Sequence, residues 1–232
     1  MYAVELNNIK KAYKKNVVLD SINFKLEENK IAVFLGLDYS GKTTLTEIIS
    51  LIKKPTEGSI KYFDKEVSTK DEIYNVVSFM PSNEGLSEHL TVFENLRLMA
   101  RTRDYNDKDA LDKIKELGIK YNIDSRFDDK VMTLSKSLKK LVSFLMCLIT
   151  DASILVLDEP FKDVDIKMKK DLVKYINELK GSKTIIVTTE LPDSALDISD
   201  ELYVLKNKNI EKIDNKITLE ELENYLFSAE VK

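Results

Sequence analysis

The stretch Gly36-Leu37-Asp38-Tyr39-Ser40-Gly41-Lys42-Thr43-Thr44 decides the fold, because it reads G-x-x-x-x-G-K-T. This is the spacing of the Walker A phosphate-binding loop, in which glycines let several backbone N–H groups converge on one anion. We expect every residue of the stretch to line a nucleotide-binding site. Lys42 is predicted to reach the β- and γ-phosphates, and the Thr43 hydroxyl is predicted to help hold Mg²⁺.

The segments on either side of this loop predict a strand and a helix. Ile31–Leu35 is an unbroken apolar run, which is typical of a strand buried on both faces of a parallel sheet. Thr43–Ile52 carries apolar residues at helical spacing. A chance match in a Gly/Ser turn would lack this strand–loop–helix context, so we favour phosphate binding over that alternative.

The composition indicates a globular protein of ordinary kind. Its 232 residues fit a single domain, 1–232, with subdomains. The net charge of −4 gives no overall case for binding nucleic acid. One cysteine, Cys147, and one histidine, His89, make a His/Cys metal site implausible, and we expect Cys147 to be buried in a reducing compartment.

Two further absences bear on the location of the protein. The N-terminus has no signal-peptide pattern. No apolar run approaches the roughly 20 residues that span a bilayer. We therefore expect a cytoplasmic protein whose role at a membrane depends on a partner.

Strand patterns alternate with helical patterns along the rest of the chain. Residues 2–9 and 17–26 alternate apolar and polar and predict antiparallel strands, joined by a basic turn at 10–16. Further strands are predicted at 59–63, 76–80, 154–157, 184–188 and 202–205, and helices at 92–101, 107–117, 138–149, 166–179 and from 218. This order predicts an α/β fold: a mostly parallel central sheet, an N-terminal antiparallel β subdomain, and a helical subdomain at roughly 82–150.

A second candidate site lies at the end of one predicted strand. Asp158 and Glu159 directly follow the apolar run Ile154–Leu157. Asp158 is placed to hold Mg²⁺, as a Walker B aspartate does, and Glu159 could polarise an attacking water as the general base. The alternative is an exposed acidic turn. The Walker A loop upstream favours the catalytic interpretation.

With both motifs, the chain resembles the nucleotide-binding subunit of ABC (ATP-binding cassette) transporters over nearly its whole length. Tyr13 lies where that family places an aromatic residue on adenine, although it could be a strand-edge tyrosine. Leu134-Ser135 opens a segment similar to the L-S-G-G-Q signature, Asp165 matches the D-loop aspartate, and Leu90–Leu96 is very like L-T-V-x-E-N-L. The resemblance implies a P-loop NTPase fold of ABC type that binds ATP and Mg²⁺. It also implies a second ATP-binding subunit and a transmembrane permease subunit as partners, with the chain at the inner face of the cell membrane.

Three regions depart from the family pattern. Lys136 and Ser137 stand where the signature has glycines. Ser82 stands where the Q-loop glutamine is expected, and Glu190 stands where the switch histidine is expected. A carboxylate beside a γ-phosphate adds repulsion unless it is protonated or paired. We therefore predict ATP binding, with hydrolysis that is weak or depends on a partner.

The resemblance implies an ATP-binding subunit that powers an ABC transporter by ATP-driven dimer closure and hydrolysis. The segment Leu219–Glu223 is similar to the tail of exporter ATPases, so we expect export. Two alternatives stay open: a regulatory module that binds ATP and hydrolyses little, and the degenerate half of a heterodimeric ABC ATPase. A single Walker A loop and the short length argue against the soluble ABC ATPases of DNA repair or translation.

Overall fold

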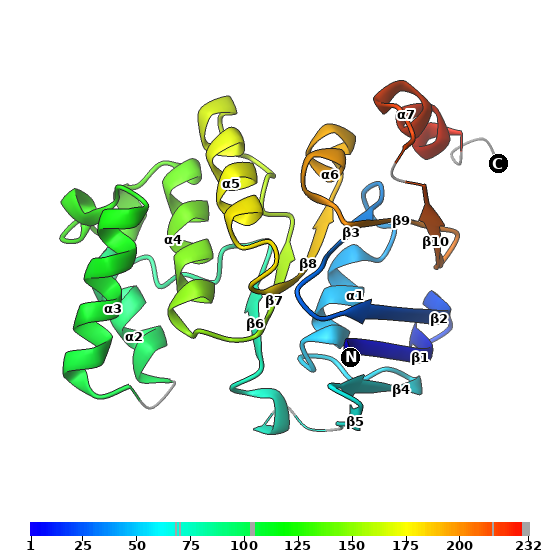
Figure 1. Ribbon diagram of the computed structural model, residues 1–232, viewed down its shortest axis with the longest axis horizontal. Coiled ribbons are helices and arrows are strands. Elements are labelled where there is room, and N and C mark those ends of the chain that lie inside the picture. Colours follow the sequence, from blue (N-terminus) through cyan, green and yellow to red (C-terminus); the bar gives the residue numbers. More distant parts are fainter. Residues whose placement is uncertain (68, 70, 103–104, 215, 229–232) are drawn as a thin grey trace.

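Two β-sheets with helices around them form the framework of the protein (Figure 1). The computed structural model describes residues 1–67, 69, 71–102, 105–214 and 216–228. The larger sheet has the strand order β10-β9-β3-β8-β7-β6. Its strands are β3 (Ile31–Leu35), β6 (Val77–Met80), β7 (Ile154–Asp158), β8 (Thr184–Thr189), β9 (Glu201–Lys206) and β10 (Asn209–Ile213). Only the β9–β10 pair is antiparallel among these strands, so the predicted mostly parallel sheet is confirmed.

The smaller sheet is the predicted N-terminal antiparallel subdomain. It contains β2 (Asn16–Glu27), β1 (Tyr2–Tyr13), β4 (Glu57–Tyr62) and β5 (Lys65–Glu66), in that spatial order. The predicted basic turn at 10–16 is wrong, because Lys11 still pairs with Leu19 across the sheet. Lysines are tolerated there because one face of this antiparallel sheet is solvated. Only Lys14 and Lys15 connect the two strands.

The helices follow the predicted pattern with shifted ends. They are α1 (Lys42–Ile49), α2 (Val92–Arg101), α3 (Asp107–Lys120), α4 (Lys136–Ile149), α5 (Ile166–Glu178), α6 (Pro192–Ile198) and α7 (Leu219–Phe227), with short 3-10 segments at Asp71–Ile73, Asp124–Arg126 and Val131–Thr133. The helix α6 was not predicted. Helix α4 begins two residues before its predicted start because the Ser135 hydroxyl caps it, accepting from the Leu138 N–H at 3.3 Å. None of the helices in the described part of the chain has the length and apolar character needed to cross a bilayer.

Helices α2, α3 and α4 form the helical subdomain at one end of the molecule (Figure 1). Helix α2 packs on α3 and α4, and α4 also contacts β6 and α5. A capping box begins α2: the Thr91 N–H donates to Glu94 Oε2 at 2.8 Å, and the Glu94 N–H donates to Thr91 Oγ1 at 3.1 Å. The polar residues of the L-T-V-x-E-N-L segment therefore start this subdomain.

The central strands are buried on both faces. In β3, Ile31, Val33 and Leu35 belong to one apolar core, whereas Ala32 and Phe34 belong to a second core shared with α1 and the smaller sheet. This alternation explains the unbroken apolar run, since both faces of the strand need apolar side chains. The parallel pairing of β3 with β8 and of β8 with β7 brings the carboxyl ends of these strands to one edge of the sheet, where ligands bind in open α/β folds.

Candidate nucleotide-binding site

The loop between β3 and α1 has the tight conformation that its glycines allow. A Cβ on Gly36 would lie 2.6 Å from Ser40 Oγ and 2.9 Å from the Leu205 carbonyl oxygen, so no side chain fits there. Gly41 has a φ of 109° and is the N-cap of α1. Tyr39 also has a positive φ, 62°, and its side chain is fully exposed. The loop therefore ends at a helix N-terminus whose free N–H groups favour an anion.

A cavity of about 600 Å³ lies at this loop. Its size suits a small-molecule ligand, since such pockets measure about 300–1,000 Å³. The predicted residues that line it are Asp38, Tyr39, Gly41, Lys42, Thr43, Thr44, Ser82, Glu159 and Glu190. The predicted residues Gly36, Leu37, Ser40 and Asp158 do not line it. The residues that line it without having been predicted are Asn16, Val18, Asn83, Lys140, Lys162 and Asp163. Residues from six separate parts of the sequence thus meet in one place.

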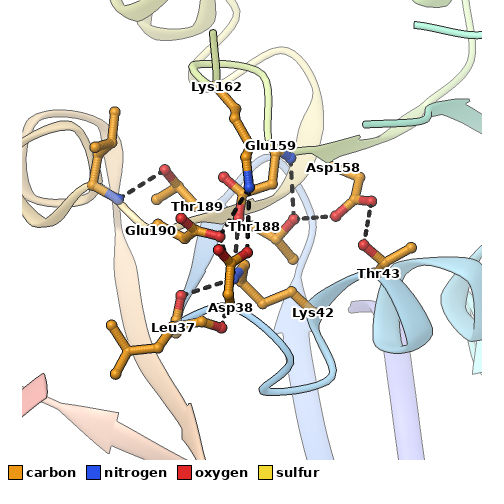
Figure 2. Close-up of polar contacts among 12 residues, drawn as sticks. Leu37, Asp38, Lys42, Thr43, Asp158, Glu159, Lys162, Thr188, Thr189 and Glu190 are labelled. Atoms are coloured by element: carbon orange, nitrogen blue, oxygen red, sulfur yellow. Dashed lines mark hydrogen bonds and ion pairs between the residues drawn. The ribbon is translucent and has the colours of Figure 1, made fainter. Parts of the chain in front are cut away.

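Lys42 lies at the centre of the polar contacts in this cavity (Figure 2). Its ammonium group donates to the carbonyl oxygens of Gly36 at 2.8 Å and Leu37 at 2.9 Å. It also lies 3.1 Å from Glu159 Oε1 and 3.3 Å from Glu190 Oε1. Only 6% of the Lys42 side chain is exposed, so these contacts hold the ammonium group firmly in place.

Asp158 and Thr43 form the arrangement expected of a Mg²⁺ site. The Thr43 hydroxyl donates to Asp158 Oδ2 at 2.8 Å, and the Thr188 hydroxyl donates to Asp158 Oδ1 at 2.6 Å. Asp158 is fully buried, so the alternative of an exposed acidic turn is wrong. A hydroxyl and a carboxylate oxygen this close fit Mg²⁺, which takes few protein ligands and completes its shell with water and phosphate oxygens.

Glu159 is a buried carboxyl group on a strained backbone. Its φ is 50°, and its N–H donates to the Thr188 carbonyl oxygen at 3.1 Å. Burial raises the pKa of Glu159, although the adjacent Lys42 ammonium opposes this shift. A carboxylate with a raised pKa is a better proton acceptor near neutral pH, which suits a general base.

Glu190 and Lys162 join the loops around the cavity. Glu190 directly follows β8, and its Oε1 lies 3.4 Å from Lys162 Nζ as well as 3.3 Å from Lys42 Nζ. Lys162 Nζ also donates to Asp38 Oδ1 at 3.2 Å (Figure 2). Hydrogen bonds with Glu190 and Lys162 lower the pKa of Asp38. The carboxylate at the switch position is therefore paired with two lysines.

Ser82 lines the cavity beside a buried lysine. The Lys140 ammonium donates to the Ser82 carbonyl oxygen at 2.6 Å and lies 3.4 Å from Glu84 Oε1. Its side chain is 2% exposed. Lys140 thus fixes the backbone at the Q-loop position. The contact is made to the Ser82 carbonyl oxygen and does not involve its short side chain.

The signature segment contacts the D-loop of the same chain. Lys136 Nζ lies 3.2 Å from Asp163 Oδ2. The Ser137 hydroxyl donates to Asp165 Oδ2 at 2.5 Å and accepts from the Asp165 N–H at 2.9 Å. These contacts lower the pKa of Asp165, mainly through the Ser137 hydrogen bond. Ser135, Lys136, Ser137 and Asp165 do not line the cavity, so the structure does not bring them to the Walker A loop of their own chain.

Tyr13 lies outside the lining of the cavity. It is 41% exposed at the end of β1, opposite Asn16, which does line the cavity. The ammonium groups of Lys11 and Lys53 lie 5.2 Å and 5.6 Å from the centre of its ring. Its adenine-stacking role stays a prediction.

The model of the family described as ABC transporter matches residues 19–162, more than half of the chain. The chain belongs to the ABC transporter family. A search of curated proteins finds the sulfate/thiosulfate import ATP-binding protein CysA of Pectobacterium atrosepticum, 29% identical over 217 residues that make up 91% of this chain and 66% of the relative. The protein of the same name from Vibrio cholerae is 29% identical over 224 residues, 94% of this chain and 59% of the relative. This chain thus spans less than two thirds of the length of each of these two relatives.

Solved structures of ABC cassettes have the same fold. One, described as the ATP-binding subunit of an ABC transporter, has a TM-score of 0.85 at 22% identity and covers 97% of this chain and 99% of its own. Another, a dimeric ATP-binding cassette in a post-hydrolysis state bound to ADP and phosphate, has a TM-score of 0.83 at 22% identity and covers 93% of this chain and 100% of its own. The predicted P-loop fold of ABC type is therefore confirmed.

Thr188, Lys140 and Lys162 are among the polar residues of the site that were not predicted from the sequence. Thr188 is the last residue but one of a buried strand, Lys140 lies within an apolar helix, and Lys162 follows the acidic pair by three residues. A lysine on the buried face of a predicted helix was the available signal for Lys140, since such a residue requires a partner. No pattern in the sequence predicted the partners of Lys162.

Proposed function

We propose that this chain is the ATP-binding subunit of an ABC transporter, acting as one domain with a helical subdomain at about 82–150. The observation that carries the proposal is the cavity at the N-terminus of α1: Lys42, Thr43 and Glu159 line it, and the buried Asp158 accepts a hydrogen bond from the Thr43 hydroxyl. The chain's membership of the ABC transporter family supports it. We propose a location at the cytoplasmic face of the cell membrane, with a permease subunit and a second ATP-binding subunit as partners.

Each residue of the site has a separate proposed role in ATP binding or hydrolysis. Lys42 would bind the β- and γ-phosphates, and Thr43 and Asp158 would hold Mg²⁺. Bound Mg²⁺ would neutralise charge that develops on the phosphates. Glu159 would accept a proton from the attacking water. Ser135, Lys136 and Ser137 would face the nucleotide of a second subunit, because they do not line the cavity of their own chain.

The direction of transport is part of the proposal. Export was expected from Leu219–Glu223, and the comparisons do not support it, because the curated relatives are named for import. We propose import. The test is uptake of labelled solute by cells with and without the chain: import requires that uptake be lost on deletion.

ATP hydrolysis by the purified chain is the decisive experiment for the proposal. We expect little turnover alone and a rise when a cassette with an intact signature is added, because Ser82, Lys136, Ser137 and Glu190 replace the residues that sense the γ-phosphate. A variant with Ser82→Gln, Lys136→Gly, Ser137→Gly and Glu190→His should turn over faster than the natural chain. Fast turnover by the unmodified chain, abolished by Glu159→Gln, would contradict partner dependence.

A regulatory module that binds ATP without hydrolysing it is the second candidate. The pairing of Glu190 with Lys42 favours it, since a carboxylate occupies the region where a γ-phosphate would bind. This candidate predicts that no partner cassette and no restored residue raises turnover, although ATP still binds.

A further inference from the structure

Two lysine ammonium groups contact the same carboxylate oxygen in the cavity. Glu190 Oε1 lies 3.3 Å from Lys42 Nζ and 3.4 Å from Lys162 Nζ. Figure 2 shows Lys162 reaching into the site from the loop after β7, whereas Lys42 comes from the start of α1. An anionic oxygen held between charged donors is also how proteins bind phosphate oxygens. Glu190 Oε1 therefore marks a point at which both lysines can bind an anion.

The three groups differ in their freedom to move. The Lys42 side chain is 6% exposed and is held by two carbonyl oxygens of the phosphate-binding loop. The side chains of Glu190 and Lys162 are 27% and 43% exposed. A ligand can displace Glu190 without unfolding any element, and Lys162 can follow the ligand because its long side chain reaches in from the surface.

The charges that line the cavity give a reason for such a displacement. The acidic and basic side chains of its lining are the carboxyl groups of Asp38, Glu159, Asp163 and Glu190 and the ammonium groups of Lys42, Lys140 and Lys162. Acidic groups outnumber basic ones, so a polyphosphate that entered beside Glu190 would be repelled. Moving Glu190 away removes one carboxylate from each lysine, and Lys42 then keeps Glu159 while Lys162 keeps Asp38.

We propose, building on the function proposed above, that Lys162 is a second lysine ligand for the terminal phosphate of ATP and that Glu190 occupies its position until the nucleotide displaces it. A phosphate oxygen at the point now held by Glu190 Oε1 lies within reach of both ammonium groups. Lys162 thereby contributes binding that the short side chain of Ser82 cannot supply. Glu190 competes with the γ-phosphate for the two lysines. It therefore lowers the affinity for ATP more than the affinity for ADP, because only ATP carries the γ-phosphate.

A purely structural role for Lys162 makes a different prediction. In that role, Lys162 only ties its loop to the phosphate-binding loop through Asp38 and Glu190. Removing the charge of either Lys162 or Glu190 would then loosen the loop and weaken binding in both cases. If Glu190 competes with phosphate, the two substitutions have opposite effects on ATP affinity.

The experiment measures the Kd of MgATP and of MgADP by calorimetry at one ionic strength. We expect Lys162→Gln to weaken ATP binding by roughly tenfold or more, the loss of one hydrogen bond between charged groups, and to weaken ADP binding by less than about threefold. Glu190→Gln should strengthen ATP binding more than ADP binding. Lys162→Arg keeps the charge and should retain most of the affinity for ATP. The control is Lys167→Gln, which removes a lysine paired with Asp171 within α5 and should change neither Kd.

Two results would overturn the role of Lys162. One is weaker ATP binding in Glu190→Gln as well as in Lys162→Gln. The other is an equal loss of ATP and ADP affinity in Lys162→Gln. A natural chain that binds no ATP at all refutes the proposed function itself, so the two failures are distinguishable. Circular dichroism of each variant establishes that it is folded before binding is measured.

Discussion

Replacing Lys42 with alanine tests both the chemistry and the energetics of the site. The Lys42 ammonium is predicted to contact the β- and γ-phosphates, and each hydrogen bond between charged groups contributes about 1.5–3 kcal/mol. Two such contacts correspond to roughly a hundredfold or greater increase in the Kd of ATP, since about 1.4 kcal/mol is a factor of ten. We therefore expect ATP binding by Lys42→Ala to be undetectable at micromolar nucleotide.

The same substitution changes the stability of the free protein. It leaves the buried Glu159 carboxylate, 5% exposed, without its nearest cation. Removing one partner of a buried ion pair costs about 3–5 kcal/mol when the other charge stays ionised. Burial already raises the pKa of Glu159, and the loss of Lys42 removes the charge that opposes this shift. The variant is therefore expected to be folded but less stable at high pH.

The sign of the pH dependence follows from the raised pKa. A folded state whose carboxyl group has a raised pKa binds protons more tightly than the unfolded state, so its stability rises as the pH falls through the folded pKa. Urea denaturation of Lys42→Ala at a series of pH values from 8 to 5 should approach the natural chain at the lower end. Lys167→Ala, an exposed lysine on α5, is the control for the removal of one positive charge.

Two outcomes would refute this reasoning. ATP affinity within a few-fold of the natural chain would mean that Lys42 is not the phosphate-binding lysine. A loss of stability that is the same at every pH would mean that Glu159 does not stay ionised and unpaired in the variant.

Three further predictions concern single residues. Glu159→Gln should lower partner-stimulated ATP hydrolysis by about 10²–10⁴-fold, the usual contribution of a general base, while calorimetry detects unchanged ATP affinity. Ser137→Ala should lower the midpoint of urea denaturation, because it breaks the 2.5 Å hydrogen bond that joins α4 to Asp165; an unchanged midpoint would contradict this role. Thr91→Ala should cost about 1 kcal/mol of unfolding free energy, because it removes one half of the capping box with Glu94; Thr91→Ser should retain most of that stability.

The large elements of the fold were predictable because their patterns are local. The apolar run Ile31–Leu35 and the spacing of the loop after it predict a buried strand, a tight loop and a helix, and the structure contains all three. The errors occurred where a sequence pattern has two structural meanings. The basic segment at 10–16 reads as a turn, yet lysines are equally stable on the exposed face of a strand, and β1 continues to Tyr13.

The partners of the charged residues could not be predicted in this way. Asp38, Lys162 and Glu190 are separated by more than twenty residues from one another, and nothing in their spacing shows that they meet. Which loops converge depends on the order β3-β8-β7, which places the ends of three strands side by side. The sequence predicts that Glu190 departs from the family pattern, and only the structure pairs it with two lysines.

The sequence by itself therefore determined the glycine-rich loop between β3 and α1, the acidic pair at the end of β7 and the class of fold, because each depends on residue types at fixed local spacing. Only the tertiary structure decided the electrostatic state of the site: which carboxylates lie against Lys42, which are buried, and where Lys162 reaches. The physical reason is that the interaction between charges depends on distance and burial in space, whereas the sequence records only their order along the chain.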